Sequence, residues 1–116
     1  MGKAASALKS QERALIKAIN FVKKARAKAA SLGLNFVGAY LTGSRARGDY
    51  IVDSDVDVVL VLRGIKGLNL IERLKMFTDI LEPGIELKVY DSEEWESEDS
   101  TWIKRLRKEA VALDTG

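Results

Sequence analysis

The chain has 116 residues, of which 47% are hydrophobic and 31% charged, a composition typical of a single globular domain spanning residues 1–116. It contains neither cysteine nor histidine, which excludes disulfides, thiolate zinc sites and imidazole bases, so any bound metal must be held by oxygen. No apolar run approaches the ~20 residues that span a bilayer, and the N-terminus lacks a signal-peptide core, so we expect a cytoplasmic protein.

Positive charge is concentrated in residues 1–30, where eight Lys or Arg face a single Glu for a net +7, which leaves −5 for the other 86 residues. Helical periodicity from Ser6 to Ser31 predicts one long amphipathic helix that ends before Gly33. Its predicted apolar face holds Leu8, Leu15, Ile19 and Val22, and its basic face holds Lys9, Arg13, Lys17, Lys24 and Lys28, with Phe21 among them. The basic face is interpreted as a solvated surface, with contact to nucleic acid or to an acidic protein as the alternatives.

The rest of the chain alternates strands and helices. Strands are predicted at Leu34–Leu41, Asp55–Leu62 and Ile85–Tyr90, helices at Leu68–Leu81 and Ser100–Leu113, and one helical turn at Arg45–Gly48. Aliphatic residues fill the end of the second strand, which indicates burial on both faces. Trp102 is expected in the core, or at an interface together with Trp95. The order α-β-turn-β-α-β-α predicts an α/β (α+β) fold with a three-stranded mixed sheet packed with helices.

Three acidic residues are predicted to gather at one edge of this sheet. Asp55 and Asp57 are two residues apart on a strand, so both project from one face. Glu86 lies near the start of the third strand, and the intervening helix indicates that the two strands run parallel with their starts side by side. Carboxylates beside a core need a compensating partner, and Mg²⁺ prefers such oxygen ligands. Asp53 shares the alternation, but the apolar run after Asp57 favours the later pair.

A Gly-Ser turn is predicted to face these acids. The first strand ends at Gly43 and Ser44, and it reaches the same edge only if it runs antiparallel to the second strand. Gly43 allows close backbone approach to a phosphate, and Ser44 opens a short helical turn whose free amides favour an anion. Arg45 and Arg47 extend positive charge toward a triphosphate.

The segments TGSRARGDYIVDSDVDVVLVL and IELKVY resemble the G-S, D-x-D and apolar-acid-apolar pattern of DNA polymerase β-type nucleotidyltransferases, over about residues 34–90. The resemblance implies that Asp55 and Asp57 bind two Mg²⁺ ions together with an NTP, expected to be ATP. It implies that Glu86 binds the catalytic metal and helps to activate the acceptor hydroxyl, while Gly43 and Ser44 hold the β- and γ-phosphates. The implied reaction transfers a nucleoside monophosphate and releases pyrophosphate.

The small size of the chain bears on its acceptor and partners. Short members of the superfamily resemble the antitoxin of two-gene modules whose partner is a helical HEPN-type protein, so a macromolecular acceptor is expected. The alternative is a non-catalytic module of the same fold that binds nucleotide or neutralises a partner by contact. Modification of an antibiotic is less favoured, because related enzymes carry an added helical domain. A homodimer or hetero-oligomer is expected, since so small a surface cannot enclose both substrates.

Overall fold

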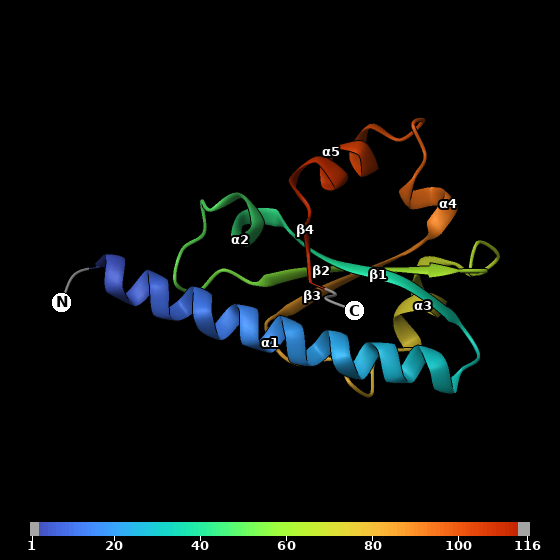
Figure 1. The fold of residues 1–116 in the computed structure, drawn as a ribbon, viewed down its shortest axis with the longest axis horizontal. Helices are drawn as coiled ribbons and strands as arrows, with labels where there is room; N and C mark the ends of the chain where they lie inside the picture. Colours follow the sequence, from blue (N-terminus) through green and yellow to red (C-terminus); the bar gives the residue numbers. More distant parts are fainter. Residues whose placement is uncertain (1–2, 114–116) are drawn as a thin grey trace.

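Helices cover both faces of one four-stranded sheet (Figure 1). The computed structural model describes the backbone of residues 3–113 and the side chains of residues 6–113. Helix α1 (Lys3–Ser31) lies along one face with α3 (Leu70–Lys75), while α4 (Ser92–Trp95) and α5 (Thr101–Glu109) lie on the other. Within residues 3–113, no helix is both long enough and apolar enough to cross a bilayer.

The sheet has the mixed topology that the sequence predicts. Its strands are β1 (Asn35–Thr42), β2 (Val56–Arg63), β3 (Ile85–Asp91) and β4 (Val111–Ala112), in the order β3-β2-β1-β4. Strand β1 runs antiparallel to β2, and β2 runs parallel to β3. The end of β1 and the starts of β2 and β3 therefore meet at one edge, where the short helix α2 (Gly43–Arg47) confirms the predicted helical turn.

Two helices are shorter than predicted, and one strand was missed. The last helix ends at Glu109 instead of continuing to Leu113, because Ala110 adopts an extended backbone and β4 then pairs with Tyr40 and Leu41 of β1. A two-residue strand is too short to show alternation in a sequence. Helix α3 begins at a capping box formed by Asn69 and Glu72, and residues 76–80 form turns.

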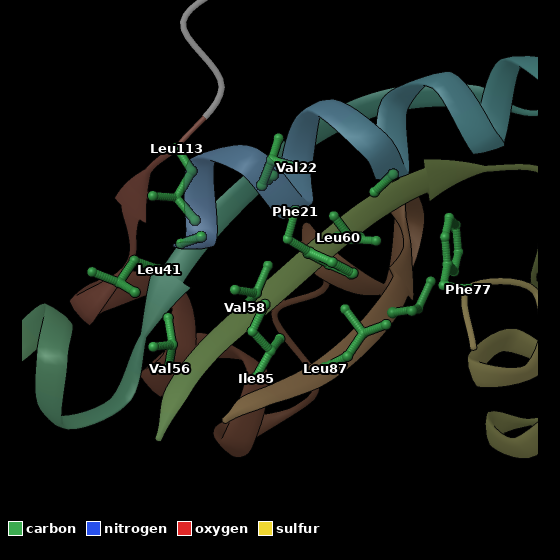
Figure 2. Close-up of a cluster of buried hydrophobic side chains, with 14 of the residues drawn as sticks. Phe21, Val22, Leu41, Val56, Val58, Leu60, Phe77, Ile85, Leu87 and Leu113 are labelled. Atoms are coloured by element: carbon green, nitrogen blue, oxygen red, sulfur yellow. The ribbon is translucent and has the colours of Figure 1, made fainter. Parts of the chain in front are cut away.

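Strand β2 is buried on both faces, as predicted. Val56, Val58, Leu60 and Leu62 join the core beneath α1, together with Phe21, Phe77 and Leu87 (Figure 2). Val59 and Val61 pack on the other face against Trp95 of α4 and Leu106 of α5. Since successive residues alternate between faces, Asp57 lies on the α5 side of the sheet.

The predicted apolar face of α1 was wrong in part, since Val22 is buried but Leu8 and Ile19 are not. The buried face consists of Ala14, Ala18, Phe21, Val22, Ala25 and Ala29, whereas Leu8 and Ile19 are exposed and Leu15 is partly buried. The four alanines are small, so the helix lies close to the sheet. Because alanine is less hydrophobic than leucine, the sequence pattern favoured the leucine-containing face instead. Basic residues beside this face contact the segment before β3: Lys17 donates to the Pro83 carbonyl (3.1 Å) and Lys28 pairs with Asp79 (2.8 Å).

Candidate active site

Asp57 and Glu86 lie side by side on parallel strands, where they are register partners. On the antiparallel side, Thr42 at the end of β1 is the partner of Asp57. Asp57 is partly buried, whereas the Glu86 side chain is 60% exposed and its Oε1 lies 3.8 Å from Lys88 Nζ. Two of the three predicted acids are thus brought together beside the Gly-Ser turn.

The carboxyl of Asp57 holds its proton unusually tightly. Burial, followed by the hydrogen bond and the charge of Glu86, raises the pKa of Asp57 to about 6. The charge of Lys88 acts in the opposite direction on this pKa, and the charge of Asp55 adds to the rise. A pair of adjacent carboxyls that resist joint ionisation gains from a bound cation, because the cation replaces their repulsion with attraction.

The oxygen atoms at this edge fit a hard divalent cation. Asp57 Oδ1 and Thr42 Oγ1 are both buried and lack a hydrogen-bond partner in the described part of the chain. A buried polar atom without a partner is costly, and Mg²⁺ accepts one or two carboxylates together with substrate phosphates. Among the described residues no three acidic side chains converge tightly enough to form a complete metal site by themselves. Asp57 and Glu86 are therefore the two carboxylates that fit the cation.

Asp55 lies outside this cleft. It is exposed, precedes β2 by one residue, and lines a separate hollow of about 540 Å³ beside the basic face of α1. Asp53 lines the same hollow and is also exposed. The alternation that placed Asp55 and Asp57 on one face requires a continuous strand, and the strand begins only at Val56.

Gly43 brings its backbone against Asp57. It has a positive φ of 73°, and a Cβ at this position would overlap Asp57 Oδ2, so a glycine is required both by conformation and by space. Gly43 and Ser44 line a cleft of about 520 Å³ together with Asp57 and Glu86. The predicted turn and the predicted acids therefore face a common space.

The two arginines of α2 have different environments. Arg45 is buried, and its guanidinium donates to the carbonyls of Ser54 and Val52 and to the side chains of Gln11 and Ser10. It joins α1 to the loop before β2 and does not line the cleft. Arg47 does line the cleft, where its Nη1 donates to both carboxylate oxygens of Glu109 at 3.2 and 3.3 Å.

Helix α5 supplies cleft residues that the sequence did not identify: Trp102, Arg105, Leu106 and Glu109. The Glu109 carboxylate also accepts a hydrogen bond from the Gly43 backbone N–H, and its side chain is only 13% exposed. No sequence signal pointed to Glu109, because the predicted helix continued to Leu113 and placed this acid inside it, whereas the helix ends at Glu109. Trp102 was expected in the core or, with Trp95, at an interface; it is 52% exposed, whereas Trp95 is buried in the core.

Comparison with known proteins agrees with this geometry. The profile of the nucleotidyltransferase domain family matches residues 11–111. A solved structure of a candidate nucleotidyltransferase from Sulfolobus solfataricus is 34% identical, with a TM-score of 0.75 over 97% of this chain and 89% of that chain. The search of curated proteins gave no match. Because the matched region runs from α1 into β4 and includes the whole cleft, the chain belongs to the nucleotidyltransferase domain family, with its polymerase β-type fold and transferase activity.

Proposed function

We propose that the protein transfers a nucleoside monophosphate from Mg²⁺-bound ATP to a hydroxyl of a macromolecular acceptor and releases pyrophosphate. The observation that carries this proposal is the pair Asp57 and Glu86 facing the Gly43–Ser44 turn across one cleft. Carboxylates opposite phosphate-binding amides are the arrangement that phosphoryl transfer needs, since the protein contributes mainly positioning and electrostatic stabilisation.

Each residue has a separate role in this proposal. The Gly43 N–H and the Ser44 amide and hydroxyl hold the β- and γ-phosphates. Asp57 and Glu86 hold the cation, which supplies neutralisation of the charge that develops on the phosphate. Asp55 is the third proposed ligand, and its carboxylate must turn from the neighbouring hollow toward Asp57 to act as one.

The chemical step is a displacement at the α-phosphorus. The acceptor oxygen forms a bond to this phosphorus while the bond to the β-phosphate oxygen breaks, and pyrophosphate leaves. Glu86 is exposed at the cleft and takes the proton of the acceptor hydroxyl. Because burial and the neighbouring Glu86 raise the pKa of Asp57 to about 6, a bound cation would favour the ionised form of Asp57.

We propose a HEPN-type protein encoded by the neighbouring gene as the partner and acceptor. The test incubates the protein with α-phosphate-labelled ATP, Mg²⁺ and the product of that gene. Label on the partner is expected for the native protein and should be lost in Asp57→Asn. Asp53→Asn is the matched control, since Asp53 is an exposed acid four residues away that does not line the cleft.

The outcomes separate the two functional classes. Label that is lost in Asp57→Asn and kept in Asp53→Asn supports transfer. A tight complex with no label supports instead the module that neutralises its partner by contact. Equal labelling by the native protein and by Asp57→Asn would refute the assigned chemistry.

A further inference from the structure

Trp102 is an exposed tryptophan on α5, the helix that buries Leu106 against the sheet. It is 52% exposed, whereas the chain's other tryptophan, Trp95, is 4% exposed and stacks on Tyr40 (5.1 Å) and Tyr90 (5.9 Å). Burial of a large aromatic side chain is strongly favourable, so its exposure leaves binding energy available for a ligand.

The position of Trp102 relates it directly to the cleft. Trp102, Arg105 and Glu109 share one face of α5 and form one wall of the cleft, which the Gly-Ser turn and the two acids also line. Glu109 lies at one end of this wall, where it accepts a hydrogen bond from the Gly43 N–H. Trp102 is seven residues earlier on α5, which is about 10 Å along a helix axis. The wall therefore runs from the phosphate-binding amides to an open aromatic surface.

We propose that Trp102 stacks on the base of the nucleotide whose phosphates are held at Gly43 and Ser44. This inference rests on the proposed function and adds the nucleoside subsite to it. A base attached through ribose to the α-phosphate lies beyond the triphosphate, and α5 offers its aromatic side chain at that distance. Arg105 is exposed and lies between Trp102 and Glu109 along α5, where its positive charge complements the α-phosphate of the nucleotide.

The proposed contact predicts a preference among nucleotides. Every base presents a π-face to an aromatic side chain, so stacking tolerates all four bases. A purine covers more of the indole than a pyrimidine does. ATP and GTP are therefore expected to bind more tightly than CTP and UTP.

The first experiment measures the affinity of the full-length protein for ATP in the presence of Mg²⁺. Trp102→Ala is expected to weaken binding by roughly 5- to 150-fold, the range of one base–aromatic stack, whereas Trp102→Phe retains most of the affinity. Lys104→Ala is the matched control, because Lys104 is exposed on the same helix, pairs with Glu98 and does not line the cleft. Half-exposed Trp102 contributes little to the core, so all three variants are expected to fold.

The second experiment uses tryptophan emission as a direct reporter. ATP is expected to quench the emission of the native protein but not that of Trp102→Phe, in which only buried Trp95 remains. Inorganic tripolyphosphate with Mg²⁺ is expected to compete with ATP without quenching, since it has no base.

Three results would overturn the stacking contact: unchanged ATP affinity in Trp102→Ala, quenching by tripolyphosphate, or quenching that persists in Trp102→Phe. If these occur while label transfer still depends on Asp57, the nucleoside subsite is refuted and the proposed function stands. Absence of both ATP binding and label transfer in the native protein would refute the proposed function and the subsite together.

Discussion

At Gly43 the backbone approaches Asp57 so closely that no side chain fits between them. This approach places the backbone of the turn beside the acid that is proposed to hold the cation. It also couples the conformation of the turn to the position of the carboxylate. A change at Gly43 therefore acts on chemistry through Asp57 as well as on the stability of the turn.

Gly43→Ala is expected to reduce nucleotidyl transfer by about 100-fold, since a shift of about 1 Å in a catalytic group has an effect of this size. Gly64→Ala is the matched control, because Gly64 has a similar positive φ of 85° but nothing lies within 4 Å of the position that an added Cβ would occupy. Backbone strain should lower the free energy of unfolding of both variants by about 1–2 kcal/mol, as measured by urea unfolding. Equal activity of the two variants would show that the contact with Asp57 has no catalytic importance.

Glu109 occupies donors that a nucleotide phosphate is proposed to use. Its carboxylate accepts from the Gly43 N–H and from Arg47, so it competes with the phosphates for the same groups. Glu109→Gln removes the negative charge that repels the phosphates and keeps a side chain of nearly the same shape. The KM for ATP should therefore fall several-fold with little change in kcat.

Steady-state kinetics of Glu109→Gln beside Glu98→Gln checks this expectation. Glu98 is an exposed acid that pairs with Arg107 and Lys104, away from the cleft. A rise in KM for Glu109→Gln would mean that Glu109 assists nucleotide binding instead of opposing it.

At the scale of elements, α1 depends on small residues for its contact with the sheet. Ala14, Ala18, Ala25 and Ala29 are almost completely inaccessible, and they surround the larger side chains of Phe21 and Val22. Close packing of this kind leaves no room for added methylene groups. The identity of the buried face is therefore decided by fit and not by the hydrophobicity of single residues.

Ala18→Leu is expected to destabilise the protein by about 1–3 kcal/mol through overpacking. Ala27→Leu on the exposed side of the same helix should change stability by less than about 0.5 kcal/mol. Chemical denaturation of both variants measures the difference. A stabilising effect of Ala18→Leu would show that the helix does not lie close to the sheet.

At the scale of the whole molecule, two carboxyl groups make stability depend on pH in opposite directions. The hydrogen bond from Arg73 lowers the pKa of Glu94, whereas burial beside Glu86 raises the pKa of Asp57 to about 6. Arg73 also donates to the Ile65 and Val89 carbonyls, so its pairing with Glu94 connects α3, β3 and α4.

The signs follow from proton binding in the native and unfolded chains. The stability that Glu94 contributes is present above its ordinary pKa of 4.5 and is lost as the pH falls through its lower native pKa. Asp57 has an ordinary pKa of 3.8, so between pH 3.8 and 6 only the native chain keeps this proton. Its contribution therefore makes the free energy of unfolding fall as the pH rises through this window.

Without divalent cations, the free energy of unfolding should decrease by about 1–3 kcal/mol between pH 4 and 7, at about 1.4 kcal/mol per pKa unit. Urea unfolding across this range checks the decrease. Asp57→Asn should abolish it, and Glu94→Gln should keep it while reducing the loss of stability below pH 4.5. A decrease that persists in Asp57→Asn would assign the titration to another group.

Periodicity within single elements was enough to predict much of the fold. The nearly continuous aliphatic run in β2 predicted a strand buried on both faces, and the helix between β2 and β3 predicted their parallel pairing. The positions of Gly43, Asp57 and Glu86 at one edge followed from strand direction, because strand ends are determined by topology. These features are local or follow from short connections, so they can be predicted from a single sequence.

The remaining features depend on contacts between residues far apart in the chain. The sequence placed Phe21 on the basic side of α1 and Arg45 at the triphosphate, but packing buries both. It also did not identify Glu109 and Trp102, which reach the cleft only because α5 folds over the end of β1. Thus the sequence by itself determined the edge where carboxylates meet the Gly-Ser turn. Only the tertiary structure decided which side chains surround that edge, because no local pattern records which surfaces come into contact.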